Sequence, residues 1–220
     1  MSHEKIARTF DQWAADGRDA GMEAEHANVA QQVIARIDVR PGEQILDLGC
    51  GNGWATRLLA KAAAGATAIG VDVSPKMIER AEALHSLTIR ARYELAAFEE
   101  LGFKDAKFDR VFSMEALYYA VDLERALREA WRVLKPGGRA DVIVDFYAES
   151  PSTAAWPEKT GLAMHFLSTS QWKSAFERAG FASVATERVR EAASSKPVDP
   201  AHAESKSAGS LWISAREPAG

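Results

Sequence analysis

The sequence predicts an α/β fold in which helices cover both faces of a mostly parallel sheet, and three observations predict it. Residues 45–48 form an apolar run with the length of a buried parallel strand, and a glycine-rich loop joins this run to a helical pattern. Strand-like runs and helical stripes then alternate along the chain. Finally, Asp72 ends the second strand-like run about 20 residues beyond the loop, where α/β folds of this kind bind ligands.

Length and composition indicate a single domain over residues 1–220. Of the 220 residues, 47% are hydrophobic, which is enough to bury one large core. Without a basic leader or an apolar run of about 20 residues, we expect a cytoplasmic protein and no membrane partner. The formal net charge of −4 has both signs interspersed, so no nucleic-acid partner is expected. Cys50 is the only cysteine, which excludes an internal disulfide.

Residues 1–40 are expected to form two lid helices over the functional site. Ile6, Phe10 and Trp13 share one helical face, and a second apolar stripe covers residues 29–37 after a break at 17–21. Pro41 and the glycine after it end the second helix. Packing directly on the sheet is the alternative for these side chains.

The loop after the first strand contains Gly49, Gly51 and Gly53. Glycine has no Cβ, so the backbone can take a positive φ and a ligand can lie directly against it. The dinucleotide fingerprint G-x-G-x-x-G does not fit, because its third glycine would fall on Trp54. The pattern Asp47-x-Gly49-x-Gly51-x-Gly53 instead resembles motif I of the class I S-adenosylmethionine-dependent methyltransferases.

Further segments resemble motifs of the same family in the expected order, namely 71–74, 108–113 and 134–138. The resemblance therefore extends over much of the chain, from about residue 40 to about residue 190. It implies a Rossmann-like, doubly wound, seven-stranded sheet in the order 3-2-1-4-5-7-6 with the last strand antiparallel. It also implies the small-molecule branch of the family, similar to the quinone-biosynthesis type.

The remaining elements follow in order along the chain. Ser74 caps a helix that Pro75 preorganises, Asp122 caps a later helix, and Ser170 caps the last one. Strands are predicted at 68–71, 87–93, 108–113 and 139–146, with a closing hairpin at 181–190 and 210–215. Segment 147–169 is predicted to be an excursion on the substrate side, and 191–209 a mobile loop.

The resemblance implies that S-adenosyl-L-methionine binds at the glycine loop and leaves as S-adenosyl-L-homocysteine. Asp72 would accept hydrogen bonds from the ribose, and Met77 would pack on the adenine or in the core. Many family members carry an aspartate where this chain has Ala97, so Phe98 and backbone amides are expected to replace that contact. The implied cofactor-binding residues are Asp47, Gly49, Cys50, Gly51, Gly53, Asp72, Val73, Met77, Ala97, Phe98, Ser113 and Met114.

Methyl transfer from a sulfonium is an in-line displacement, so the protein chiefly positions the acceptor and excludes water. Glu115 and Tyr118 follow the fourth strand and should face the reaction. His165 comes from the excursion and is the first choice for a general base, because histidine titrates near neutrality. A structural, hydrogen-bonded role is the alternative. Neither an Asp-Asp-Asn cluster nor a His/Cys ligand spacing is present, so a metal-independent enzyme is expected.

Aromatic side chains would line the acceptor pocket, with Trp13, Tyr119 and Trp156 as the main candidates. Met22 and His26 of the lid helices are further candidates to face the site. This composition favours methyl transfer to a small-molecule acceptor. A tRNA- or RNA-modifying methyltransferase is the first alternative, and a non-catalytic S-adenosylmethionine-binding protein is the second. The acceptor, the atom that is methylated and the oligomeric state are left open.

Overall fold

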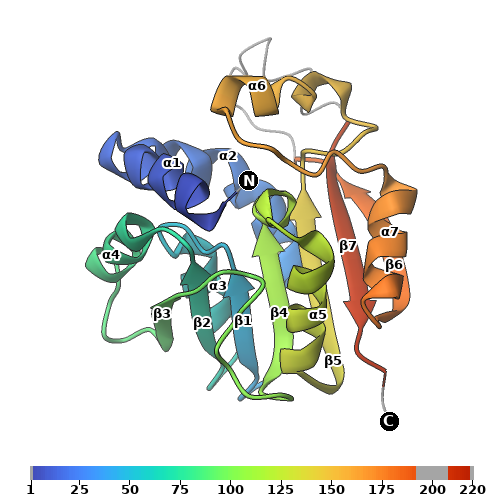
Figure 1. Cartoon of the computed structure of the whole chain (residues 1–220). Coiled ribbons are helices and arrows are strands. Elements are labelled where there is room, and N and C mark those ends of the chain that lie inside the picture. Colours follow the sequence, from blue (N-terminus) through green and yellow to red (C-terminus); the bar gives the residue numbers. More distant parts are fainter. Residues whose placement is uncertain (1, 192–207, 219–220) are drawn as a thin grey trace.

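The computed structural model describes residues 2–191 and 208–218, and its centre is a seven-stranded sheet in the order β3-β2-β1-β4-β5-β7-β6 (Figure 1). Neighbouring strands are parallel except for β7, which runs antiparallel to β5 and β6. The predicted fold class, strand order and antiparallel last strand are confirmed. The strands are β1 (Gln44–Leu48), β2 (Thr67–Asp72), β3 (Ala91–Leu95), β4 (Phe108–Met114), β5 (Leu134–Val144), β6 (Ala182–Val189) and β7 (Ser210–Arg216).

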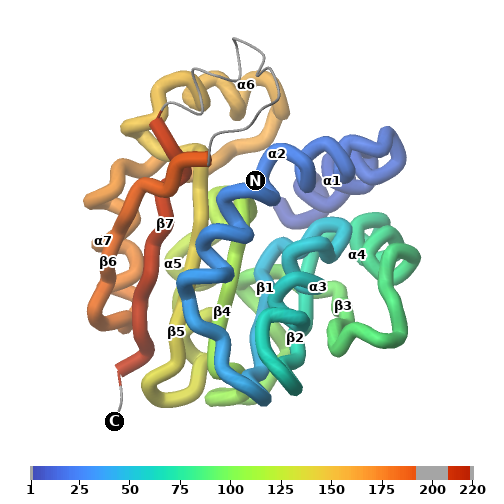
Figure 2. The backbone as a smooth tube through the Cα atoms, turned by 180° about the vertical axis from the view of Figure 1, so that it is seen from behind, coloured from blue at the N-terminus to red at the C-terminus, as the bar shows by residue number. Residues whose placement is uncertain are grey.

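Helices cover both faces of this sheet. One face carries α2 and α3 (Figure 2), and the other carries α5 and α7 (Figure 1). None of the helices in the described part of the chain is long and apolar enough to cross a membrane. The helices are α1 (His3–Ala15), α2 (Arg18–Arg36), α3 (Trp54–Lys61), α4 (Pro75–Ala83), α5 (Leu123–Val133), α6 (Trp156–Thr160) and α7 (Thr169–Arg178), with 3₁₀ turns at Leu117–Tyr119 and Pro151–Thr153.

Side chains that alternate along the central strands hold the helices on the two faces. Ile45 belongs to an apolar cluster with Val33 of α2 and Leu59 of α3. The next residue, Leu46, points the other way and joins a cluster that includes Trp172 of α7. All these side chains are buried, so the sheet has apolar contacts on both sides.

The carboxyl ends of β1, β2 and β4 lie level with one another, because Leu48 pairs with Val71 on one side and with Ser113 on the other. The loops that follow these strands therefore meet at one edge of the sheet. Helix α1, the start of α2 and helix α6 all lie beyond that edge (Figure 1). Segments 3–15 and 156–160 and the start of α2 thus lie over the strand ends, whereas Val29 and Val33 of α2 pack on one face of the sheet, which is the alternative for that helix. A role of these segments as a lid stays a prediction.

The third strand begins later than the sequence predicts. Residues 86–89 form a turn, in which the Ile89 amide donates to the Ser86 carbonyl and the Ser86 and Thr88 hydroxyls are 2.9 Å apart. Leu87 therefore lies outside the sheet with its side chain 99% exposed. The strand itself starts where Ala91 pairs with β2.

Other boundaries also differ. The cap of α7 is Ser168, not Ser170, because Ser168 and Gln171 exchange side-chain and backbone hydrogen bonds in a capping box. The break between α1 and α2 consists of Asp16 and Gly17, and Gly21 lies inside α2. Strand β5 begins directly after α5, earlier than predicted. Most of segment 191–209, predicted as a loop, lies outside the described residues.

One edge of the sheet carries exposed apolar side chains. Strand β3 is the first strand in the sheet order, so only its β2 side is paired within the sheet. Leu84 precedes this strand, Leu87 lies in the turn before it, and Leu95 ends it, and all three are exposed. The opposite edge is β6.

Candidate active site

A cavity of about 330 Å³ lies at the carboxyl ends of β1, β2 and β4. We call the part formed by residues 49–53 and 72–77 the loop wall, and the part formed by α1, α2 and α6 the lid wall. The predicted cofactor-binding residues that line it are Gly49, Cys50, Gly51, Asp72, Val73, Met77, Ala97, Phe98 and Met114. The predicted catalytic and substrate-binding residues that line it are Glu115, Tyr118, Trp13, Tyr119 and Trp156.

The glycine loop is held tightly against the neighbouring strand ends. The amides of Gly49 and Cys50 both donate to the carbonyl of Val71, at 2.8 and 3.0 Å. Gly49 has a φ of +74°, and a Cβ there would lie 2.2 Å from the Cβ of Ala116, so this position requires glycine. Gly51 has a φ of +52°, but nothing lies within 4 Å of where its Cβ would be. The backbone at Gly51 therefore borders open space that a ligand can fill.

Asp72 connects the tip of β2 to this loop. Its Oδ2 accepts the amide of Gly51 and its Oδ1 accepts the amide of Ser74, both at 2.9 Å. Burial raises the pKa of Asp72, and the amide hydrogen bonds act in the opposite direction. Each carboxylate oxygen has a further lone pair, so Asp72 can still accept hydrogen bonds from the hydroxyls of a ligand.

Three predicted cofactor-binding residues do not line the cavity. Asp47 lies beneath the loop, where its Oδ2 accepts the hydroxyl of Thr56 at 2.6 Å and burial raises its pKa to about 7. Gly53 packs on the ring of Tyr93, which would lie 2.4 Å from a Cβ at Gly53. The hydroxyl of Ser113 donates to a carbonyl of β1 at 2.9 Å. The contacts of Asp47, Gly53 and Ser113 hold the loop in shape. Their positions outside the cavity lining do not support a direct contact with the cofactor.

The rest of the loop wall is largely apolar. Met77 is fully buried in the first turn of α4, where Ser74 Oγ accepts its amide and so caps the helix as predicted. Phe98 and Ala97 line the same region, and Ala97 offers no side-chain acceptor. Burial raises the pKa of the Cys50 thiol well above its ordinary value, which keeps this cysteine protonated.

The start of α2 contributes two charged residues that the sequence argument missed. Asp19 lines the cavity with its side chain 2% exposed, and its Oδ2 accepts from Asn52 and from Arg80, both at 3.1 Å. Its Oδ1 is buried and has no hydrogen-bond partner among the described residues. Arg18 also lines the cavity, with its guanidinium 4.5 Å from the ring centre of Trp13. The sequence did contain a signal for these two residues, because a pair of opposite charges directly follows the break between the two N-terminal helices.

Aromatic side chains from three separate segments meet beside these charges. The ring of Tyr119 packs edge-on against Phe10 of α1, with centroids 5.1 Å apart. Tyr118 packs against Phe146, and Phe146 stacks on Trp156 of α6 with centroids 5.9 Å apart. The lid wall is therefore joined to the strand ends by ring contacts.

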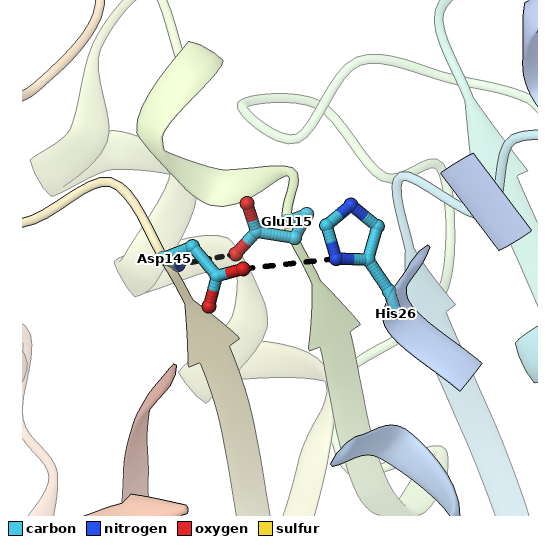
Figure 3. A group of neighbouring side chains, drawn as sticks. All are labelled: His26, Glu115 and Asp145. Carbon is cyan, nitrogen blue, oxygen red and sulfur yellow. Dashed lines mark hydrogen bonds and ion pairs between the residues drawn. The ribbon is translucent and has the colours of Figure 1, made fainter. Parts of the chain in front are cut away.

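A histidine and two carboxylates converge between the lid wall and the strand ends (Figure 3). His26 comes from α2, Glu115 follows β4 and Asp145 follows β5, and their ligand atoms lie within 4.8 Å of one another. His26 Nδ1 is 3.7 Å from Asp145 Oδ2. Such side chains could hold a divalent cation or exchange a proton. The expectation of a metal-independent enzyme stays a prediction.

His165, the first choice for a general base, is not among the residues that line the cavity. Its Nε2 is 2.9 Å from the carbonyl of Ala120, and its amide donates to the carbonyl of Tyr118 at 2.9 Å. These contacts tie the excursion to the turn after β4. The placement favours the structural alternative over a role in proton transfer.

Comparisons with known proteins agree with this architecture. A family model described as a methyltransferase domain matches residues 46–141. One chain of a solved complex, between the Haloferax volcanii Trm112 methyltransferase activator and a protein assigned as a methyltransferase, is 34% identical. That match covers 95% of this chain and 97% of the other, with a TM-score of 0.88.

Two curated relatives match over shorter spans. The O-methyltransferase resE of Aspergillus sclerotiorum is 33% identical over 65% of this chain and 56% of its own length. The 2-methyl-6-phytyl-1,4-hydroquinone methyltransferase of Synechocystis sp. is 31% identical over 63% of this chain and 50% of its own length. This chain spans about half the length of the curated relatives it matches. The motif order, the sheet topology and the extended match to a solved structure together establish that this chain belongs to the class I S-adenosylmethionine-dependent methyltransferases.

Proposed function

We propose that this chain binds S-adenosylmethionine on the loop wall and transfers its methyl group to a small-molecule acceptor held by the lid wall. The observation that carries the proposal is one continuous cavity, in which Gly51 and Asp72 lie at one side and Tyr118, Tyr119 and Trp156 at another. The relatives named as O-methyltransferase and hydroquinone methyltransferase support a small, hydroxylated acceptor.

Two features of the cavity fit this ligand. The open space at Gly51 suits the close approach of a ribose or a methionyl chain, and Asp72 stands beside it with lone pairs for ribose hydroxyls. The buried Oδ1 of Asp19 suits an ammonium group, while Arg18 suits a carboxylate. We therefore assign the amino-acid end of the ligand to the start of α2.

When bound, S-adenosylmethionine supplies an electrophilic methyl group on a sulfonium. The contribution of the chain is to position the acceptor and to keep water away. The aromatic contacts of Phe10, Tyr119 and Trp156 close the lid wall over the strand ends, which supports water exclusion. A flat or apolar acceptor would gain further by burying its surface against these rings.

The alternatives receive less support. An RNA-modifying enzyme would present a basic surface around its site, whereas this chain has a net charge of −4 and a mostly apolar acceptor region. A protein that only binds the cofactor would need no further space between the loop wall and the lid wall, where an acceptor could lie. Detectable methylation of any acceptor would exclude that second alternative.

The first experiment measures S-adenosylhomocysteine binding by calorimetry for the wild type and for Asp72→Ala. Loss of the charged acceptor should weaken binding by about 1.5–3 kcal/mol, or about 10- to 150-fold. Asp105→Ala is the matched control, because Asp105 is 78% exposed and pairs with Arg132 on the α5 side of the sheet. Unchanged affinity in Asp72→Ala would reject the assignment of the ribose to this residue.

The second experiment supplies methyl-labelled S-adenosylmethionine with a panel of phenols, alcohols, amines and short RNA. Label in a phenol or alcohol at a rate independent of salt is the expected result. Transfer to RNA that falls steeply with salt would instead favour the RNA-modifying reading.

A further inference from the structure

Within the group formed by His26, Glu115 and Asp145, the two carboxylates have different surroundings. Glu115 Oε1 accepts the backbone amide of Asp145, and Glu115 Oε2 accepts the hydroxyl of Tyr118 at 2.8 Å. Glu115 also has a φ of +53°, a conformation that is rare for residues other than glycine and that clusters at functional sites. Its carboxyl group is therefore held in place from both sides and from its own backbone.

Burial raises the pKa of Glu115 well above its ordinary value, and the nearby charge of Asp145 raises it further. The two carboxylates therefore differ in their contacts, because both oxygens of Glu115 accept hydrogen bonds whereas Asp145 faces His26. One oxygen of Asp145 lies 3.7 Å from His26 Nδ1, and its other oxygen is buried without a hydrogen-bond partner among the described residues. Glu25 of α2 and Glu191, which follows β6, line a smaller pocket next to the same pair.

His26 borders two cavities. It lines the main cavity and the smaller pocket, with its side chain 17% exposed. Figure 3 shows Nδ1 directed at Asp145 and the other ring nitrogen, Nε2, directed away from it. A proton on Nδ1 would suit the contact with Asp145, and Nε2 would then carry a lone pair.

We propose that His26 Nε2 accepts the proton of a hydroxyl acceptor, and that Asp145 is the positioning residue that keeps the proton of the neutral ring on Nδ1. The assignment deepens the proposed function and rests on it, since it names the acceptor class as a phenol or an alcohol. A neutral hydroxyl is a weak nucleophile and gains from an adjacent base, whereas a neutral amine already offers a lone pair.

The proton balance is complete within the site. The acceptor O–H bond breaks as its proton passes to Nε2, and the oxygen forms a bond to the methyl carbon. The electron pair of the broken carbon–sulfur bond stays on sulfur, which becomes the neutral thioether of S-adenosylhomocysteine. His26 becomes a cation that Asp145 stabilises, and it releases its proton to water before the next turnover.

The decisive experiment reads the tautomer of His26 and needs no acceptor. ¹⁵N spectra of the whole chain with labelled histidines are recorded at about pH 9, where imidazole rings are neutral, with and without S-adenosylhomocysteine. The chain has 5 histidines, and His26→Gln identifies the signals of this one. His85→Gln is the matched control, because His85 packs on Tyr93 and does not line the main cavity.

The expected result is a proton on Nδ1 of His26 in the wild type, and a change to the Nε2–H tautomer in Asp145→Asn and Asp145→Ala. An Nε2–H tautomer in the wild type, or a tautomer that does not respond to Asp145, would overturn the proposal. Calorimetry with S-adenosylhomocysteine separately reports whether the cofactor assignment holds. The two failures are therefore distinguishable.

Two further measurements sharpen the result. With any phenol or alcohol that accepts label, His26→Gln should lower the methyl-transfer rate by about 10²- to 10⁴-fold and change S-adenosylhomocysteine affinity by less than about twofold. A wild-type rate in His26→Gln, or transfer only to amines, would contradict the proposal. Zn²⁺ binding that is lost in His26→Gln, Glu115→Gln and Asp145→Asn would also overturn it, because a metal ion on Nδ1 excludes a proton there.

Discussion

The loop wall and the lid wall differ in the kind of atom that faces the cavity. On the loop wall, backbone amides near Gly49 and Gly51 are fixed by groups at the end of the neighbouring strand β2, namely Val71 and Asp72. On the lid wall, the groups are side chains from α1, α2 and α6, and they meet partners far away in the chain. We infer that substitutions at the loop-wall glycines act through backbone geometry and have abrupt effects, whereas those at the charged residues of the lid wall act through charge and have graded effects.

The largest effects are expected from two glycines of the loop wall that differ only in their surroundings. Gly49→Val should prevent stable folding, because its Cβ would lie 2.2 Å from Ala116 in addition to the cost of a positive φ. Gly51→Val should fold but lose S-adenosylhomocysteine binding by more than about 100-fold, because its side chain would fill open space. Circular dichroism and calorimetry separate the two outcomes. Normal binding by Gly51→Val would show that the ligand does not approach the loop closely, and the contrast between the two walls would then be wrong.

A second large effect is the pH dependence of stability that Asp47, beneath the loop wall, should cause. Asp47 has an ordinary pKa of 3.8 when unfolded and about 7 when folded, so the folded chain binds more protons between these values. The free energy of unfolding should therefore fall as pH rises from about 4 to about 7, by about 4 kcal/mol from this group. Asp47→Asn should remove that part of the slope. Urea unfolding of both proteins at pH 4 and pH 8 measures it, and equal slopes would contradict the prediction.

A smaller, graded effect is expected on the lid wall. Asp19→Asn should weaken S-adenosylhomocysteine binding by about 10- to 30-fold, because it removes the charge assigned to the ligand ammonium group. Methylthioadenosine lacks the amino-acid end, so its affinity should stay the same. Calorimetry with both ligands tests this, and an equal loss for the two would show that the substitution disturbs the fold instead.

The smallest effect is expected at His165, which lies outside the cavity. His165→Ala should lower the free energy of unfolding by about 1 kcal/mol, because the hydrogen bond to the Ala120 carbonyl is lost. The methyl-transfer rate at saturating acceptor should be unchanged. A rate that falls by about 100-fold with unchanged stability would restore His165 as a general base.

The difference between the walls also explains what the sequence could predict. Asp47, the glycines and Asp72 stand at fixed spacings because a strand, a tight loop and the next strand fix their distances. The sheet order could likewise be inferred from the motifs. The roles of Asp19 and Asp145 could not, because their partners come from segments whose meeting depends on tertiary packing.

His26 and His165 illustrate this limit. Both were candidates from the sequence, and both lie in segments that cover the strand ends. Only the three-dimensional arrangement separates a ring that lines the cavity beside a carboxylate from a ring anchored on a backbone carbonyl. The boundaries of β3 and α7 were missed for a local reason, since serine and threonine side chains at 86–88 and 168 satisfy backbone groups outside the regular elements.

The open edge at β3 has a consequence for handling the purified chain. An edge strand can pair with a strand of another molecule, and exposed leucines beside it favour that contact. Leu84, Leu87 and Leu95 flank this edge, while Arg92 and Glu94 within β3 oppose flat stacking by their charge. Concentrated samples should therefore scatter light through reversible self-association, and Leu87→Lys should raise solubility without touching the cavity.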